Sequence, residues 1–189
     1  MSIQEDTRPA TYADIEALPK NIVGEILFGS LYAHPRPRPQ HALSATSLAS
    51  EVHNSFHRGN GGPGGWIILS EPEVHLGEHV VVPDIAGWRR ERLPVLPDAA
   101  YFDLAPDWVC EVLSPSTAQI DRTLKLEVYA EYDVGHVWFV DPDLRTLETM
   151  SLNGGRWMLG SAFKDNDAVS AAPFEAHTFD LGILWDDVG

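Results

Sequence analysis

The sequence is poor in cysteine and in long apolar runs. Cys110 is its one cysteine, so no disulfide can form within the chain. It lies in the apolar run Trp108-Val109-Cys110, which predicts a small buried hydrophobic residue. No apolar stretch approaches the ~20 residues of a membrane span, and no basic segment followed by an apolar one opens the chain. These absences predict a reduced, cytoplasmic location.

Basic residues are scarce as well. The chain carries 13 Lys and Arg against 28 Asp and Glu, which gives a net charge of −15. A general nucleic-acid binder carries a basic patch or stripe, so the charge argues against that class. A nuclease is not excluded, because carboxylates that hold a metal add negative charge and bound Mg²⁺ reverses the local sign.

The composition is that of a folded chain. Hydrophobic residues make up 44% and charged residues 22% of the 189 positions, which fits one domain over residues 1–189. Residues 1–10 are polar, and we expect them to form a disordered tail. No internal repeat is visible.

The apolar pattern predicts an α+β or α/β domain, in which helices pack on a mixed sheet. An Asn153-Gly154 turn indicates a hairpin, and Ser116 with Gln119 is typical of a capping box at a helix start. The tail from Asp167 onward shows no clear pattern. The expected elements are a helix over 11–18, a hairpin over 21–34, a helix over 41–56, strands over 66–69 and 74–88, a buried strand over 107–113, a helix over 117–132, a buried strand over 137–141 and a hairpin over 145–162.

Three side chains indicate chemistry. Asp84 ends a strand, Glu111 lies inside the most apolar strand, and Lys125 lies on the following helix. A carboxylate within a buried strand is costly unless something compensates it, and a metal ion is one such partner. Mg²⁺ prefers oxygen ligands and takes one or two carboxylates beside its waters. Asp84, Glu111 and the backbone carbonyl of Val112 could supply these oxygens, while Lys125 could orient a water or stabilise charge on a phosphate.

Simpler interpretations remain open from the residues alone. The dipeptide Pro-Asp occurs four times, at 83-84, 97-98, 106-107 and 142-143, and turn formation explains most such pairs. Asp107 rivals Asp84, but it is four residues from Glu111 along a strand, which is ~13 Å and too far to share one ion. Lys125 follows Asp121 by one helical turn, and a surface ion pair would explain that spacing.

The strand and helix around these residues resemble a known family. Glu111-Val-Leu-Ser-Pro-Ser-Thr117, then Asp121, Lys125, Tyr129-Ala130 and Val137-Trp-Phe-Val-Asp-Pro142, is similar to the Uma-type restriction endonucleases, a branch of the PD-(D/E)XK nuclease superfamily. The resemblance covers about residues 10 to 185. Further matching segments are 24–27, 39–41, 82–86 and 90–94.

The resemblance implies a restriction-endonuclease-like αβββαβ core, with extra amino-terminal and carboxy-terminal hairpins. It implies a Mg²⁺- or Mn²⁺-dependent endonuclease acting on DNA, with Asp84 and Glu111 as metal ligands and Lys125 as the catalytic lysine. Leu113, two residues after Glu111, stands where the superfamily has lysine. The lysine is therefore expected to have moved onto the helix, at Lys125.

Supporting residues follow from the same resemblance. Glu25 matches an amino-terminal acid that would hold a metal-bound water, and His41 matches a histidine of the family. Asp121 is a third supporting candidate. Arg89 and Arg90 follow the Asp84 strand and could contact DNA phosphates, although a solvated loop explains them too.

Two further expectations concern assembly and activity. A homodimer is expected, because such nucleases pair so that both strands can be cut. The alternative function is a catalytically inactive nuclease-fold protein that binds a partner or joins an assembly. The acidic charge favours that alternative.

Overall fold

The computed structural model describes residues 8–35 and 37–185. Most of the expected tail over residues 1–10 lies outside this range. Of its last three residues, Ala10 donates a backbone hydrogen bond to the carbonyl of Gly29 at 2.8 Å, so this end of the tail is held against the first hairpin.

The chain folds into alternating strands and helices in the expected order. The helices are α1 (Tyr12–Glu16), α2 (Pro39–Val52), α3 (Ala118–Ile120) and α4 (Leu126–Glu131), with the π-helical turns η1 (His53–His57) and η2 (Asp121–Lys125) and the 3-10 turn η3 (Leu181–Leu184). The strands are β1 (Ile22–Leu27), β2 (Ser30–Pro35), β3 (Trp66–Ser70), β4 (Val74–Leu76), β5 (His79–Val81), β6 (Ile85–Arg89), β7 (Trp108–Val112), β8 (His136–Asp141), β9 (Thr146–Asn153), β10 (Arg156–Lys164), β11 (Ala168–Val169) and β12 (Phe179–Asp180).

The main sheet has six strands in the order β10-β9-β8-β7-β6-β3. Only β7 and β8 are parallel among these neighbours, so the sheet is mixed. The parallel pair needs a crossover, which α3, η2 and α4 supply as one continuous helical segment. The order α2, β3, β6, β7, helical segment, β8 confirms the expected αβββαβ core, and the hairpins β1–β2 and β9–β10 confirm the two additions.

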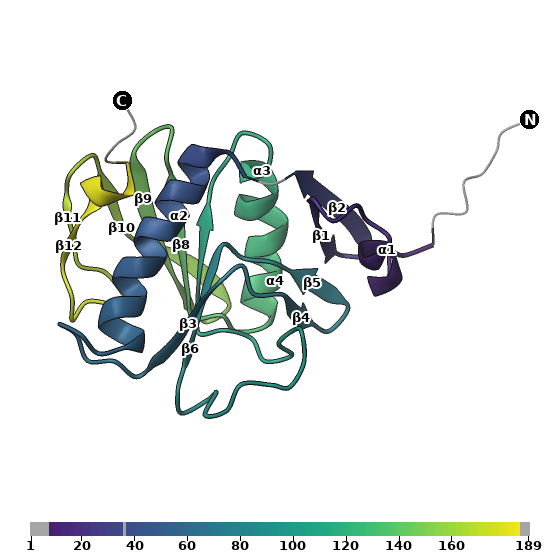
Figure 1. Ribbon diagram of the computed structural model, residues 1–189, viewed down its shortest axis with the longest axis horizontal. Coiled ribbons are helices and arrows are strands. Elements are labelled where there is room, and N and C mark those ends of the chain that lie inside the picture. Colours follow the sequence, from purple (N-terminus) through teal and green to yellow (C-terminus); the bar gives the residue numbers. More distant parts are fainter. Residues whose placement is uncertain (1–7, 36, 186–189) are drawn as a thin grey trace, which may run out of the picture.

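Helices cover both faces of this sheet (Figure 1). Strand β7 shows the reason, because all of its residues are buried and successive side chains point to opposite faces. Trp108 and Cys110 join one apolar cluster with Leu48 of α2. Val109 joins the other cluster with Val128 of α4. The buried strand and the buried cysteine are both confirmed.

A second sheet brings the amino-terminal hairpin to the α4 side. It has the order β2-β1-β5-β4, and β1 meets β5 at Ile26 and Val80. Leu27 and Val81 from these strands belong to the same apolar cluster as Val128. Figure 1 shows β1, β2 and α1 at one end of the molecule and β11–β12 at the other.

Two local expectations need correction or completion. The capping box from Ser116 to Gln119 is wrong: Thr117 is the N-cap of α3, without a side-chain cap, and Ser116 Oγ bonds Ser114 Oγ at 3.0 Å. The tail from Asp167 forms β11, β12 and η3 and packs on the α2 face through buried side chains such as Phe174 and Trp185.

Within the described residues, no helix has the length and apolar character to cross a bilayer.

Gly87 of β6 tests the packing of the α2 face. A Cβ there would lie 2.9 Å from Ile68 Cδ1, 3.2 Å from Trp108 Cε3 and 3.3 Å from Trp66 Cε3. We expect Gly87→Ala to lower the free energy of unfolding by about 1–3 kcal/mol, because two buried indole rings must shift. Urea unfolding midpoints would measure it. Gly135→Ala is the control, since its Cβ would meet only the Asp107 carbonyl at 3.4 Å. Equal midpoints for the two variants would contradict the prediction.

Candidate active site

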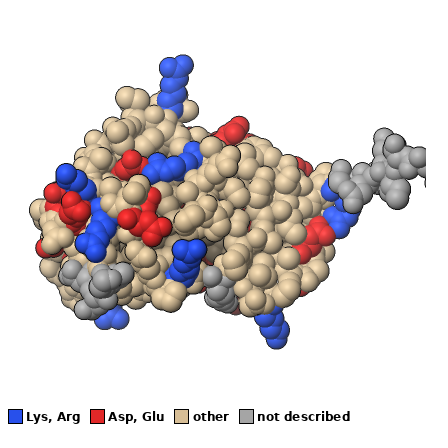
Figure 2. Space-filling model, turned by 90° about the horizontal axis from the view of Figure 1, so that it is seen from above, with Lys and Arg blue, Asp and Glu red and all other residues tan. Residues whose placement is uncertain are grey.

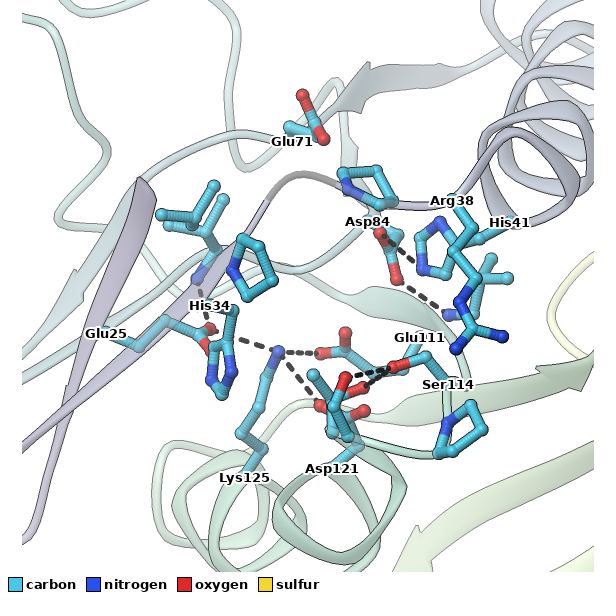
Figure 3. A pocket seen from close by; sticks show the side chains of 18 residues that line it. Glu25, His34, Arg38, His41, Glu71, Asp84, Glu111, Ser114, Asp121 and Lys125 are labelled. Atoms are coloured by element: carbon cyan, nitrogen blue, oxygen red, sulfur yellow. Dashed lines mark hydrogen bonds and ion pairs between the residues drawn. The ribbon is translucent and has the colours of Figure 1, made fainter. Parts of the chain in front are cut away.

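A buried lysine and three carboxylates meet between the helical segment and the sheets (Figure 3). Lys125 Nζ lies 2.8 Å from Glu111 Oε1, 3.1 Å from Glu25 Oε1 and 3.4 Å from Asp121 Oδ1. None of these four side chains is more than 6% exposed. The surface ion pair considered for Asp121 and Lys125 is therefore wrong, because both groups point inward.

The backbone explains this direction. Asp121 and Lys125 open and close the π-helical turn η2. Such a turn widens the helix locally and is frequent at functional sites. The crossover from β7 to β8 lays this helical segment over the sheet face that carries Glu111. The lysine side chain thereby reaches the carboxylate on the neighbouring strand.

Asp84 lies next to Glu111 across the strand pair. The antiparallel register pairs Ile85 with Cys110, so one step further places Asp84 opposite Glu111, where Cβ atoms are about 5 Å apart. Asp84 Oδ2 accepts a hydrogen bond from Val112 N at 2.7 Å, and Oδ1 lies 3.4 Å from His41 Nε2. Asp84 is thus held by β7 on one side and α2 on the other.

Asp107, the alternative to Asp84 as a metal ligand, contacts Arg89 and Arg92 instead. Its Oδ2 accepts from the backbone N–H of Arg89 at 2.8 Å, and its Oδ1 lies 2.8 Å from Arg92 Nη1. It does not line the cavity that holds Asp84 and Glu111. Asp107 therefore closes the loop after β6 and belongs to the scaffold.

Glu25 connects the second sheet to this cluster. Its Oε1 accepts from Val82 N at 2.7 Å as well as lying 3.1 Å from Lys125 Nζ. Val82 is two residues before Asp84, so the β1 strand, the lysine and the segment that leads to Asp84 are tied together through one carboxylate.

The cluster carries more negative charge than its lysine can balance. Burial raises the pKa of Glu111 well above 4.5; Lys125 opposes this, whereas Asp121 and Asp84 add to it. Burial also raises the pKa of Asp121. For Lys125, burial lowers the pKa, but Glu111 and Glu25 outweigh it and raise the pKa well above 10.5. The amine therefore stays charged.

These groups line a cavity of about 470 Å³. Its walls come from the β1–β2 hairpin, from residues 37–41 and 82–84, and from residues 111–117 with η2. Figure 3 shows the Arg38 side chain extending past His41 toward Ser114. Burial lowers the pKa of His41, but the Asp84 carboxylate and the Val112 backbone outweigh it and raise that pKa.

The donor set fits one hard divalent cation. In residues 8–35 and 37–185, no three His, Cys, Asp or Glu side chains form a ready metal cluster. Mg²⁺ does not require one, since it takes one or two carboxylates and keeps several waters. Asp84, Glu111 and the Val112 carbonyl would hold it. Three buried carboxyl groups share a single ammonium, and the raised pKa values of two of them show that ionising all three is costly; a bound cation would stabilise the ionised forms.

Two cavity neighbours were not predicted. Tyr129 donates its hydroxyl to Glu111 Oε1 at 2.5 Å, and it follows Lys125 by four residues, a spacing that could have indicated a shared helix face. His34 Nε2 is buried, has no hydrogen-bond partner among the described residues and lies 3.8 Å from Glu25 Oε2. No sequence signal distinguishes His34, because only the pairing of β1 with β2 brings it there.

Arg89 and Arg90, the two arginines expected to contact DNA phosphates, lie outside the cavity. The Arg89 guanidinium lies 4.7 Å from the centre of the Trp66 ring, and Arg90 Nη2 donates to the His57 carbonyl at 3.3 Å. Neither lines the cavity, whereas Arg38 does. Contact of Arg89 and Arg90 with DNA stays a prediction.

Comparison with known proteins agrees with this fold. The crystal structure of "a putative nuclease belonging to DUF820" from Anabaena variabilis ATCC 29413 matches with a TM-score of 0.75 and 24% sequence identity, over 94% of this chain and 98% of that chain. The two chains therefore share one fold, and it contains the restriction-endonuclease-like αβββαβ core described above. A family model described as "Putative restriction endonuclease" matches residues 10–182. The chain belongs to this family, Uma2, as the resemblance predicted. A search of curated proteins found no match.

The raised pKa of Glu111 gives a test without metal. In the unfolded chain this carboxyl titrates near 4.5, but the folded state favours its protonated form. Its contribution to stability is therefore present below the unfolded-state pKa and lost as the pH rises through the folded one. We expect metal-free Glu111→Gln to be more stable than wild type at neutral pH, with a gap that closes as the pH falls toward 4.5.

Urea unfolding at several pH values would measure this gap. Glu127→Gln is the matched control, because Glu127 is exposed on α4 and does not line the cavity. The control should track wild type throughout. A Glu111→Gln variant that is less stable than wild type at neutral pH, or a gap independent of pH, would contradict the expectation.

Proposed function

We propose that this protein is an endonuclease that hydrolyses DNA phosphodiester bonds with the help of Mg²⁺ or Mn²⁺. Asp84, Glu111 and the Val112 carbonyl are the metal ligands, and Lys125 is the catalytic lysine. The observation that supports this most is the 2.8 Å contact of Lys125 Nζ with Glu111 Oε1 inside a cavity that Asp84 also lines. Membership of the Uma2 family supports it independently.

Each residue has a separate task in this proposal. A bound Mg²⁺ supplies Lewis-acid polarisation of the phosphate. Lys125 keeps its charge, and its amine stabilises the negative charge that develops on the phosphate as water adds and the bond to the leaving oxygen breaks. Glu25 and Asp121 hold the amine beside Glu111. The Val112 N–H holds Asp84.

The surface charge limits how DNA is held. Figure 2 shows Lys and Arg interspersed with Asp and Glu on the face it draws, without a continuous basic band. Non-specific affinity for DNA scales with the number of phosphates that cations neutralise. We therefore infer that DNA phosphates bind mainly in the cavity, through the metal, Lys125 and Arg38.

A plasmid-nicking assay with Mg²⁺ or Mn²⁺ tests the activity. We expect Asp84→Asn and Glu111→Gln to reduce cleavage to background, because each removes a metal ligand. Lys125→Met should lower kcat about 10²- to 10³-fold, the usual loss when one preorganised charge-stabilising donor is removed. Glu127→Gln should cut like wild type, and a chelator should stop all cleavage. A homodimer that cuts both strands in one encounter would show as linear product formed without accumulation of the nicked form.

Unchanged cleavage in all three variants would assign the activity to another site or to a contaminant. The alternative of an inactive nuclease-fold binding protein has its own signature. Calorimetric titration with Mn²⁺ separates the two, because the nuclease binds the ion through Asp84 and Glu111. Absence of heat in wild type, together with absence of cleavage, would favour the binding protein.

Arginine variants test where DNA lies. In Ca²⁺, we expect Arg38→Ala to weaken the binding of a short duplex regardless of its sequence and to reduce the slope of log K against log salt by about 1. Arg89→Ala and Arg90→Ala provide the comparison, since these side chains already contact Trp66 and the His57 carbonyl. A change of slope confined to these two variants would instead move the DNA path to the end of β6.

A further inference from the structure

A buried tyrosine touches the carboxylate to which the proposed function assigns the metal. Tyr129 of α4 is 0% exposed, and its ring packs in the apolar cluster that contains Val128 and Val137. Its hydroxyl donates to Glu111 Oε1 at 2.5 Å. A hydroxyl buried at this depth costs free energy unless it is bonded, and a phenylalanine would fill the same apolar space. The hydroxyl therefore has a task at Glu111.

The two oxygens of Glu111 are used unequally. Oε1 takes both the Tyr129 hydroxyl at 2.5 Å and Lys125 Nζ at 2.8 Å. A carboxylate oxygen has about two lone-pair positions, so these donors saturate it. Among the described residues, no hydrogen bond or ion pair to Oε2 is recorded. Glu111 lines the cavity opposite the strand end that carries Asp84, so Oε2 is the oxygen left for a cation.

Tyr129 and Lys125 do not hold Oε1 in the same way. The lysine amine is shared with Glu25 and Asp121 and sits on a long flexible side chain. The tyrosine has two side-chain torsions and a ring enclosed by the core, and Glu111 is its recorded hydrogen-bond partner. The tyrosine therefore fixes the carboxylate plane, whereas the lysine supplies charge.

We propose that Tyr129 is a positioning residue. Its hydroxyl holds Glu111 Oε1, so that Glu111 Oε2 and the Asp84 carboxylate can coordinate the same divalent cation. This inference rests on the proposed function, because it concerns the same site. Partners that orient a metal-binding side chain through its other atoms have measurable weight: their loss commonly weakens metal binding or activity about 10- to 100-fold.

The experiment compares Tyr129→Phe with Tyr132→Phe. Both variants remove one phenol hydroxyl near the end of the same helical segment, but the Tyr132 hydroxyl lies over the Gly77 turn, whereas the Tyr129 hydroxyl bonds Glu111. Calorimetric titration with Mn²⁺ should show affinity about tenfold weaker for Tyr129→Phe and unchanged for Tyr132→Phe. The rise in Tm that Mn²⁺ produces should shrink in Tyr129→Phe alone. In the nicking assay, kcat should fall while KM for DNA stays constant.

A purely structural role would give a different result. It would lower the metal-free Tm of Tyr129→Phe and leave both the Mn²⁺ affinity and the metal-induced rise in Tm as in wild type, which would overturn the inference. If wild type itself binds no Mn²⁺, the proposed function fails and the inference fails with it. Wild-type binding with an unaltered Tyr129→Phe variant overturns the inference alone.

A second measurement covers the case in which Tyr129→Phe does not fold. Binding of Mg²⁺ at Oε2 withdraws electron density from the carboxylate and weakens the bond from the phenol, so the near-ultraviolet absorbance of tyrosine should change on titration. Wild type and Tyr132→Phe should show the same change. A titration with Mg²⁺ that leaves the tyrosine absorbance constant, although calorimetry detects binding, would overturn the inference.

Discussion

The contact on which the molecule depends most is one ammonium shared by three buried carboxylates. Glu25, Glu111 and Asp121 come from the second sheet, the main sheet and the helical segment, and the side chain of each is almost inaccessible to solvent. Like charges at this depth repel strongly, so the cation of Lys125 is what allows the three elements to approach. Removing the lysine from this cluster would leave three buried carboxylates without a cation, which is costly. The Lys125 amine therefore links the second sheet, the main sheet and the helical segment through its ion pairs.

The two faces of the main sheet differ in character: one is packed with apolar side chains, and the other also carries the charged cavity. The α2 face is a continuous apolar cluster in which Trp108, Trp138 and Phe174 pack edge to face. The α4 face combines an apolar cluster with the charged groups of the cavity. Buried charged side chains gather around the cavity on this second face, and functional sites are where such departures from the usual rules of burial are expected. The apolar face stabilises a fold that carries a costly site on its other side.

The sequence predicted more of the fold than of the site. The apolar run of β7 and the Asn153-Gly154 turn are strong local signals, and both elements form as expected. The C-terminal tail could not be placed, because β11 and β12 are two residues each and depend on distant partners such as Leu48 in the α2 cluster. The Ser116 cap failed because the side chains of the 114–117 segment bond one another instead.

Within the site, local pattern and tertiary structure disagreed in an informative way. The need of Glu111 for a partner follows from the sequence, since a lone acid in a buried strand is costly. The direction of Lys125 does not, because its spacing from Asp121 equally suits a solvent-exposed helix. Only the crossover between parallel strands and the π-helical turn decide it. Tyr129 was missed for the same reason: a tyrosine in an amphipathic helix reads as core until its hydroxyl is seen to meet a carboxylate.

The place of Leu113 has a consequence for how such proteins are found. Leu113 follows Glu111 by two residues, so it faces the same side of the sheet, but it is buried in the α4 cluster. The amine that this strand position would have presented arrives instead from the helical segment above. Chemistry responds to the point in space that an ammonium occupies and is indifferent to the stretch of backbone that delivers it. A signature written as a fixed interval between acid and base along one strand will therefore overlook chains like this one, whereas a search by three-dimensional arrangement will retrieve them.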